Sequence, residues 1–520
     1  MTRHSAQPRR LRALALFVAA AATPAAAFSP VLARMRDAHI DALRAGGAAV
    51  ARARLAQGLG VPPDQYFQQT LDHFDVLNNL PGTAWPQRFW VNSSFFDSNP
   101  DKANAPVVFY VEGEGAGSPY SVLGGEHVAL AETYGALIVA LEHRGYGASI
   151  PTSDLTTSNM RFITSHQAIA DIALFATAWL APTYNLSFAT NKLVTFGGSY
   201  PGVLSAWARL RLPHIVHTAV STSSPVQSVV DYTLYNDVCA RSFSYPLVGG
   251  SPACTANIAS AFAAIDAAFT GSADARHAMA TKLMSCTGLD AVNDTMWAAS
   301  NYASLMMGIV QYNRDGGSGL NIRNVCATMT QAGVAPIDAF AQVVAKSQGS
   351  QCMDNAYADY LVQLRNTVVD KGAGGLGLRS WTWQTCAQFA FYQSCEDGTL
   401  CPFSKLMTLE SSYAQCQDGF GDVMSNQLND AGVAFTNAYL GGQRIAGSRI
   451  IFVNGDVDPW HALSVYPGNN VTSFDPLQPT VFIPGGSHCS NMGTPSDSDP
   501  PALVAAHAEI DGFLSQFLAL

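Results

Sequence analysis

The chain has little charge for its length and no concentration of positive charge. Of its 520 residues, 13% are charged and 48% are hydrophobic, and the formal net charge is −10. Disordered chains have the opposite balance, so we expect a folded protein. Because there is no lysine-rich run or basic patch, nucleic acid is not an expected partner. A chain of this length exceeds what one hydrophobic core usually supports, which predicts two domains or one domain with a large insertion.

No cysteine occurs before Cys239. The chain has ten cysteines, of which nine lie from Cys239 to Cys416 and the last is Cys489. No pair has the CxxC spacing that is typical of zinc sites, and we expect neither a metal ion nor another cofactor. The even number favours structural disulfides formed in an oxidising compartment.

Downstream of the N-terminus, no apolar run is long enough to cross a membrane. The N-terminus has four arginines, an apolar run over 13–22 and small residues at 25–27, which predicts a signal peptide over 1–27. The apolar run is too short for a membrane anchor. Glycosylation sequons start at Asn92, Asn185, Asn293 and Asn470. We therefore expect the secretory pathway, with an extracellular, lysosomal or vacuolar destination.

Strand-like runs alternate with helix-like segments in two separate parts of the chain. Residues 28–60 are expected to form a helical extension or a propeptide. Apolar runs at 107–111, 136–141, 193–196 and 215–222 indicate strands, with a long helix over 163–180. Strand patterns return at 449–453 and 480–483, before a helix over 502–518. This alternation predicts an α/β fold with a mostly parallel sheet flanked by helices.

The segment between the two strand-rich parts has a different composition. Residues 226–430 carry most of the cysteines and have a helical pattern with few strand runs. We interpret this segment as an inserted helical domain tied by disulfides. It would divide the sheet domain into a first part over 61–225 and a second part over 431–520.

The segment 194–207 has the pattern of a nucleophile elbow. A strand-like run ends at Gly197 and Gly198, Ser199 follows, and a helix-compatible segment begins at once. Pro201 occupies the position where the usual pattern has glycine, and proline is tolerated in the first turn of a helix. The alternative is an ordinary glycine-rich turn between a strand and a helix.

Candidate partners for the serine follow the two late strands. In α/β-hydrolase sheets the order along the chain is serine, acid, histidine, and Asp458 and His488 fit that order. Asp458 could instead form an Asx turn before a proline, and His488 could be a structural loop histidine. Asp456 and His461 are nearby competitors. A metal site built from these four residues is a poor alternative, since it lacks the spacings of strong metal motifs.

The oxyanion hole of such an enzyme needs two backbone N–H groups. One is expected from Tyr200 and the other from Gly113 or Glu114, in the glycine-rich turn after an early strand. A simple tight turn at the second position is compatible with this role.

Eight sequence blocks together resemble the S28 family of serine peptidases. They are spread through most of the mature chain in the order found in the family. The blocks are 69–74 (QTLDHF), 87–89 (QRF), 113–115 (GEG), 142–147 (EHRGYG), 197–200 (GGSY), 383–386 (WQTC), 454–460 (NGDVDPW) and 487–489 (SHC). The stretches 401–404 (CPFS), 458–461 (DPWH) and 487–489 (SHC) look most like its thymus-specific serine protease branch.

The resemblance implies a role for each residue of the candidate triad. Ser199 corresponds to the nucleophile, His488 to the general base and then acid, and Asp458 to the orienting acid. Asp458 is chosen over Asp456 because the family aspartate directly precedes Pro-Trp. The insertion corresponds to a helical cap over the active site. Trp460 matches a proline-pocket residue, and Val203 stands where the carboxypeptidase of the family has methionine.

The resemblance also implies a disulfide pattern and an assembly. The implied pairs are Cys239–Cys395, Cys254–Cys326, Cys286–Cys352 and Cys386–Cys416, and we expect the remaining Cys401 and Cys489 to join. Homodimers occur in the family, so a homodimer is compatible with it.

The function expected from these observations is a secreted or lysosomal serine exopeptidase that cleaves peptides next to proline through an acyl-enzyme. The choice between carboxypeptidase and dipeptidyl-peptidase stays open. An esterase or lipase on the same fold is the alternative, because the elbow and triad do not dictate the substrate. A non-catalytic binding protein is a further alternative.

Overall fold

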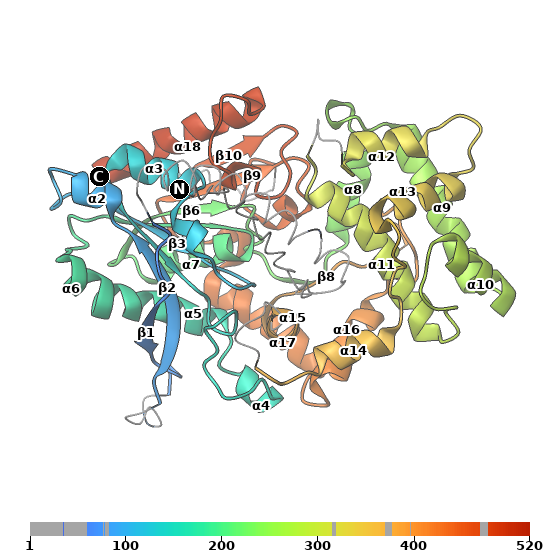
Figure 1. Ribbon diagram of the computed structural model, residues 1–520, viewed down its shortest axis with the longest axis horizontal. Helices are drawn as coiled ribbons and strands as arrows, with labels where there is room; N and C mark the ends of the chain where they lie inside the picture. Colours follow the sequence, from blue (N-terminus) through green and yellow to red (C-terminus); the bar gives the residue numbers. More distant parts are fainter. Residues whose placement is uncertain are drawn as a thin grey trace, which may run out of the picture.

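The computed structural model describes residues 35, 60–75, 77, 83–314, 319–369, 377–395, 397–468 and 477–520. The predicted signal peptide, almost all of 28–60 and the sequon at Asn470 lie outside the described residues. The described chain forms a strand-rich part and a part that is almost entirely helical, which lie side by side in Figure 1.

The strand-rich part is built on one eight-stranded sheet with the order β1-β2-β4-β3-β5-β6-β9-β10. Its strands are β1 (Gln65–Gln69), β2 (Trp85–Asn92), β3 (Val107–Val111), β4 (Leu137–Leu141), β5 (Leu193–Gly198), β6 (Val216–Thr222), β9 (Ile450–Gly455) and β10 (Thr480–Ile483). From β4 to β10 every neighbouring pair is parallel, whereas β1–β2 and β2–β4 are antiparallel. The chain therefore has the α/β-hydrolase architecture that the sequence predicts.

The six parallel strands are those predicted from the apolar runs. The antiparallel pair β1–β2 was not predicted as strands. For β1 the reason lies in its residues, Gln-Tyr-Phe-Gln-Gln, of which the first four alternate between partly buried and exposed positions and only the last is buried. An edge strand of this kind lacks the continuous apolar run that marks a strand buried on both faces.

Helices cover both faces of the sheet. Neighbouring residues of each strand point to opposite faces, so they pack against different helices. Val108 and Ile138 pack beneath α3, whereas Phe109 and Val139 join the core beneath α5 and α7. Helix α18 covers β6, β9 and β10 on the α3 face. The helical segments of this part are α2 (Ser94–Ser98), η1 (Pro119–Val122), α3 (Glu126–Tyr134), α4 (Thr157–Met160), α5 (Ser165–Phe175), η2 (Ala176–Leu180), α6 (Ala181–Tyr184), α7 (Tyr200–Arg211), η6 (Gly442–Arg444), η7 (Pro459–Leu463), η8 (Ser490–Met492) and α18 (Pro501–Ala519).

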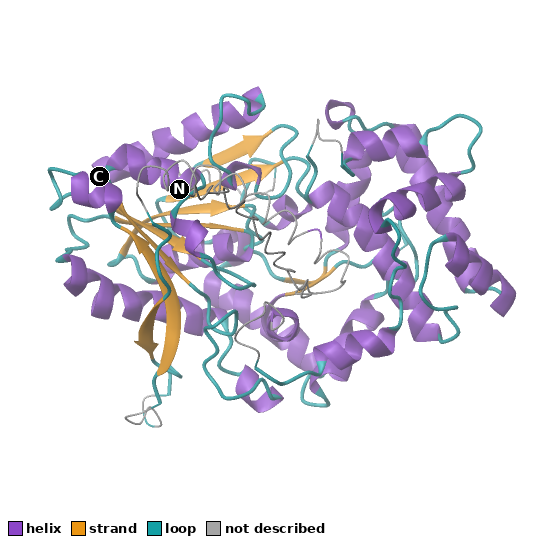
Figure 2. Cartoon of the chain, viewed as in Figure 1, coloured by secondary structure: helices purple, strands orange, loops and turns teal. Residues whose placement is uncertain are grey.

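Nearly all of the chain between β6 and β9 forms the helical part, whose regular structure is drawn mainly as purple helices in Figure 2. Its two short strands, β7 and β8, pair with each other and not with the main sheet. The elements are β7 (Val229–Asp231), α8 (Thr233–Ser244), η3 (Pro246–Val248), α9 (Pro252–Phe269), α10 (Ala273–Lys282), α11 (Val292–Gln311), α12 (Ile322–Met329), α13 (Pro336–Gln348), α14 (Tyr357–Leu364), α15 (Gly377–Gln384), η5 (Thr385–Phe389), β8 (Ala390–Tyr392), α16 (Leu409–Phe420) and α17 (Asn426–Leu440). We call this segment the helical insertion.

Four disulfides tie the helical insertion, and two of the expected pairs are wrong. Cys254–Cys326, Cys286–Cys352 and Cys386–Cys416 are formed as the resemblance implies. Cys395 pairs with Cys401, so the pairs Cys239–Cys395 and Cys401–Cys489 do not exist, and Cys239 and Cys489 are buried free thiols.

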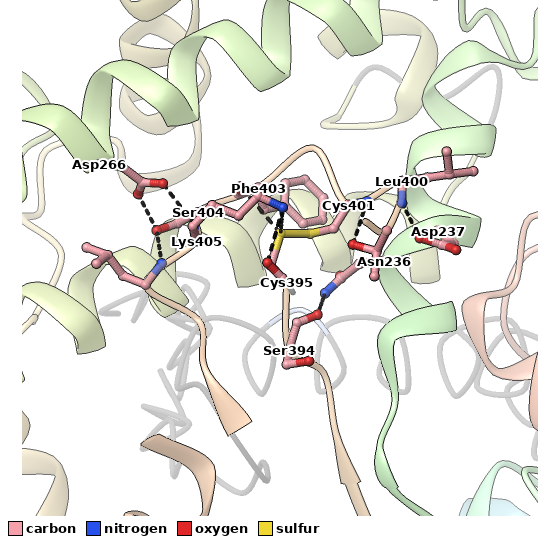
Figure 3. The surroundings of a disulfide bond; sticks show 12 residues. Asn236, Asp237, Asp266, Ser394, Cys395, Leu400, Cys401, Phe403, Ser404 and Lys405 are labelled. Atoms are coloured by element: carbon pink, nitrogen blue, oxygen red, sulfur yellow. Dashed lines mark hydrogen bonds between the residues drawn. A yellow bond between two sulfur atoms is a disulfide. The ribbon is translucent and has the colours of Figure 1, made fainter. Parts of the chain in front are cut away.

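The physical reason is local geometry. Cys395 and Cys401 lie on the two arms of one loop, with their Cα atoms 5.5 Å apart, which is ordinary disulfide spacing. Helix α8 packs beside this loop: Asn236 donates a hydrogen bond to the carbonyl of Ser394, and Asp237 accepts one from the N–H of Leu400 (Figure 3). Cys239 therefore belongs to the helix that supports the loop and is not bonded to it.

A buried polar network explains several of the sequence blocks in the first part of the chain. Arg144 is fully buried and makes two hydrogen bonds to the carboxylate of Asp171, which also contacts His73. Arg144 further donates to the backbone carbonyls of Thr70 and Leu71. The 69–74 and 142–147 blocks therefore meet in a structural network that joins the N-terminal segment to the sheet.

Candidate active site

Ser199 lies on a strained turn between β5 and α7. Its backbone has φ 62° and ψ −133°, a left-handed conformation that is uncommon for a residue other than glycine. The Ser199 N–H donates to the carbonyl of Thr222 in the neighbouring strand at 2.8 Å, and its carbonyl accepts from Val203 N–H at 3.0 Å. Strain of this kind is typical of functional positions. The geometry matches the nucleophile elbow that the sequence predicts.

Close packing explains Gly197 in the elbow and Gly113 in the turn after β3. A Cβ on Gly197 would lie 2.3 Å from the carbonyl oxygen of Pro201, and one on Gly113 would lie 2.3 Å from the Cγ of the same proline. Pro201 occupies the first turn of α7, as expected. The turn that begins at Gly113 is thereby packed directly against the elbow.

Asp458 and His488 face each other at the ends of the two late strands. Asp458 Oδ1 is 2.9 Å from His488 Nδ1 and also accepts from the backbone N–H of Trp460 at 3.0 Å. Both side chains are buried. Burial disfavours the charged imidazolium, but the carboxylate of Asp458 and the neighbouring Cys489 offset it and raise the pKa of His488 well above its usual value.

The two competing residues have other partners. Asp456 accepts a hydrogen bond from the N–H of Gly485 at 2.7 Å, and burial raises the pKa of its carboxyl. His461 Nδ1 lies 2.6 Å from the backbone carbonyl of Asp458, and burial lowers its pKa. Of the two aspartates, the structure brings Asp458 to His488.

Ser199 and His488 line the same cavity, together with Gly113, Glu114 and Tyr312. Within the described chain no hydrogen bond joins the serine hydroxyl to the imidazole. Such contacts are often long in unliganded enzymes and shorten when substrate binds. The cavity therefore holds a candidate nucleophile, a candidate base and the backbone of the turn after β3.

The side chain of Tyr200 is held by a chain of hydrogen bonds. Burial lowers the pKa of His143 to about 4, so its imidazole is neutral. Its Nδ1 faces the carbonyl of Arg144 and must carry the proton, so its Nε2 accepts from the Tyr200 hydroxyl at 2.9 Å. The same hydroxyl accepts from Gln384 Nε2 at 2.8 Å, and Gln384 belongs to the helical insertion. This network fixes the residue whose N–H the sequence assigns to the oxyanion hole.

The helical insertion also contacts the loop that carries His488. The carbonyl of Gln311, at the end of α11, accepts from the His488 N–H at 2.9 Å. The ring of Tyr312 packs edge-on against the imidazole, with 6.0 Å between ring centroids. Neither residue was predicted from the sequence, because a polar pair at the end of an apolar helix has no signal of its own.

The two predicted pocket residues lie outside the lining of this cavity. Trp460 is half-buried, and its ring lies 6.4 Å from that of His488, against the rings of Tyr232 and Tyr235. Val203 is buried in the core beneath the elbow. Trp460 is therefore near the site, whereas Val203 supports it from behind.

The three described sequons differ in accessibility. Asn185 and Asn293 are exposed. The amide nitrogen of Asn92 donates to the carbonyl of Val122, so its side chain is already engaged.

Among the described residues no group of three or more histidine, cysteine, aspartate and glutamate side chains is arranged to hold a metal ion. None of the helices in the described ranges combines the length and the apolar character that a membrane span requires.

Comparisons with known proteins extend the resemblance over most of the chain. A model of the family described as serine carboxypeptidase S28 matches residues 69–510. The thymus-specific serine protease of Mus musculus is 34% identical over 497 residues, covering 94% of each chain. The human protein of the same name is 35% identical, covering 89% of this chain and 90% of its own. The lysosomal Pro-X carboxypeptidase of Bos taurus is 25% identical, covering 88% of each chain.

Proposed function

The chain belongs to the S28 family of serine peptidases, and we propose that it is a serine exopeptidase whose catalytic residues are Ser199, His488 and Asp458. The observation that carries this proposal is the convergence of three segments. A serine on a strained elbow opens into a cavity that His488 also lines, and His488 is paired with a buried aspartate.

The proposed reaction proceeds through an acyl-enzyme. His488 takes the proton of Ser199 as its oxygen attacks the peptide carbonyl, and then gives that proton to the departing amine. A water molecule, activated by the same imidazole, releases the acyl group. Asp458 holds the imidazole with the proton on Nδ1 and stabilises the positive charge that forms on it.

Two backbone N–H groups would stabilise the negative oxygen of the tetrahedral intermediate. The Tyr200 N–H lies in the first turn of α7, where N–H groups have no partner within the helix. The second donor comes from Gly113 or Glu114, in the turn packed against Pro201. Removing one such donor typically lowers kcat by roughly 10²- to 10³-fold.

The proposed substrates are peptides with proline next to the cleaved bond. The name of the bovine relative contains Pro-X carboxypeptidase, and Trp460 offers an aromatic face close to His488. A flat aromatic ring packs well against a pyrrolidine ring. We further propose the secretory pathway as its location, which the four disulfides and the lysosomal relative support.

The test uses two peptides and one variant. One peptide carries Xaa-Pro at its free N-terminus, and the other carries Pro-Xaa at its C-terminus. Mass spectrometry after incubation with the purified protein shows which end is shortened, and Ser199→Ala is the control. We expect one of the two peptides to be trimmed by the wild type and neither by the variant. Internal cleavage, or equal trimming by Ser199→Ala, would overturn the proposal.

A further inference from the structure

We propose that Gln311, at the end of α11 in the helical insertion, is a positioning residue that keeps Asp458 and His488 at hydrogen-bonding distance from each other. The inference rests on the proposed roles of that pair. It means that the base of the reaction is assembled by the insertion and not by the sheet alone.

The backbone at the end of α11 supports the histidine loop directly. The carbonyl of Gln311 accepts from the His488 N–H at 2.9 Å, and the carbonyl of Asn313 accepts from the Ser487 hydroxyl at 2.9 Å. Two successive residues of the loop are thus bonded to one segment of the insertion. A shift of α11 would move the imidazole.

The side chain of Gln311 supports the aspartate segment. Its Oε1 accepts from the indole Nε1 of Trp460 at 3.0 Å and from the hydroxyl of Tyr235 at 2.5 Å. An indole nitrogen can only donate, so the oxygen of the amide must face it and its orientation is fixed. The backbone N–H of Trp460 in turn donates to Asp458 Oδ1 at 3.0 Å. One glutamine therefore contacts both loops that make the Asp458–His488 hydrogen bond: the loop of Asp458 through Trp460, and the loop of His488 through its backbone N–H.

Burial makes these contacts hard to replace. Gln311 is 4% exposed and Tyr235 is fully buried, so water does not readily substitute for a lost acceptor. Catalysis is sensitive to displacements of the reacting groups by as little as 1 Å, which can lower the rate by about 100-fold. A loss of the amide oxygen should therefore act on the reaction as well as on the stability of the fold.

The test measures the rate at which a fluorophosphonate probe labels Ser199, as a function of pH. This readout reports the protonation of His488 and needs no known peptide substrate. Gln311→Met removes the acceptor at similar length, and Gln311→Glu keeps an oxygen for both donors. Gln415→Met is the matched control, because Gln415 is a buried insertion glutamine whose Oε1 accepts from the hydroxyl of Tyr360, with no contact to the triad.

We expect Gln311→Met to be labelled about 100-fold more slowly than the wild type. Its acid limb should also move to lower pH, because a loosened contact with Asp458 no longer raises the pKa of His488 as far. Gln311→Glu should recover to within about tenfold of the wild type, since the carboxyl oxygen accepts the same two hydrogen bonds. Gln415→Met should match the wild type in rate and in pH profile.

Several results would overturn the inference. One is an unchanged pH profile in Gln311→Met, which indicates a purely structural role, and another is a Gln311→Glu variant as slow as Gln311→Met. If Gln311→Met does not fold, Tyr235→Phe removes one of the two donors and should shift the acid limb in the same direction by a smaller amount. An unshifted profile there would contradict the inference too. A wild type that is not labelled at Ser199 would instead refute the proposed function.

Discussion

Ser199 and the Asp458–His488 pair are held by different kinds of structure. Ser199 is fixed by the backbone of a strand, a sharp turn and a helix, and its N–H is bonded within the sheet. The aspartate and the histidine lie on loops after β9 and β10, and both loops are bonded to the helical insertion through Gln311. The proposed nucleophile is therefore held by the sheet domain alone, whereas the position of the proposed base also depends on the docking of the helical insertion.

This difference gives the helical insertion two roles. It contacts the elbow that carries Ser199, and it contacts the loop that carries His488. Gln384 reaches the Tyr200 hydroxyl beside the nucleophile, and Gln311 reaches the histidine loop. The first contact only reinforces an elbow that the backbone already defines, while the second is part of what we propose to align His488 as the base. Variants of Gln384 should therefore affect mainly the stability of the fold, whereas variants of Gln311 should affect the rate and its pH dependence.

The largest effect is expected from Asp458→Asn. The change keeps the size of the side chain but removes the charge that holds the imidazole in the required tautomer, so kcat should fall by roughly 10⁴-fold. The wild-type acid limb should lie above pH 6.5, because the pKa of His488 is raised, and should move down in the variant. A pH–rate profile of both proteins checks this. A loss of less than tenfold would contradict the role of Asp458.

A smaller loss is expected from Gly113→Ala. The new Cβ would lie 2.3 Å from the Cγ of Pro201, so the turn must move away from the elbow. We expect kcat to fall by about 10²- to 10³-fold, as for a lost oxyanion donor, with little change in KM. Steady-state kinetics measures the two parameters. A change confined to KM would indicate that the turn binds substrate without stabilising the oxyanion.

Gln384→Met should weaken the fold more than the chemistry. It removes the donor to the Tyr200 hydroxyl and the acceptor of the buried Tyr146 hydroxyl, which should lower the free energy of unfolding by about 1–3 kcal/mol. Because the elbow is set by its backbone, kcat should fall by less than about tenfold, and the pH profile should keep its position. Urea unfolding and a pH–rate profile test both statements. A shift of the acid limb like that expected for Gln311→Met would contradict the difference proposed between the elbow and the loops of Asp458 and His488.

The smallest effect is expected from a group of contacts between the loop after His488 and the sheet domain. Asn491, three residues after His488, donates to the buried carboxylate of Glu126, which also contacts His507 of α18 at 2.6 Å. Burial opposes the charge of His507, but the Glu126 contact and the more distant Asp499 raise its pKa. A histidine with a raised pKa stabilises the fold fully below about pH 6.5 and loses that contribution as the pH rises through its folded pKa.

His507→Gln should therefore flatten the dependence of Tm on pH. We expect the wild type to lose stability between mildly acidic and mildly alkaline conditions, and the variant to lose less, with a difference on the order of 2 °C. Thermal unfolding of both proteins across this pH range measures it. Identical slopes would show that the Glu126–His507 contact does not control the stability of this region.

The sequence predicted the sheet domain better than the contacts of the helical insertion. Runs such as 107–111 and 480–483 became strands because they are apolar and their neighbours have turn-forming residues. The strand β1 escaped notice because three of its five residues are glutamine. Periodicity detects an element only when burial imposes a pattern on its residues.

The candidate triad was predictable because each member occupies a fixed place relative to a strand. Gln311 was not, since its role comes from a contact with Trp460, 149 residues away in the sequence. Two of the five expected disulfide pairs, Cys239–Cys395 and Cys401–Cys489, were wrong for a similar reason. Cys395 had two chemically equivalent partners, and only the fold shows that Cys401 lies across the same loop while Cys239 is within α8.

The identity of the nucleophile is the claim on which the whole account depends, and one measurement tests it directly. The purified protein is treated with a fluorophosphonate, digested and mapped by mass spectrometry. The account predicts a single modified serine, Ser199, and no modification in Ser199→Ala or in protein unfolded before treatment. Modification of another serine, or none in the folded wild type, would contradict it.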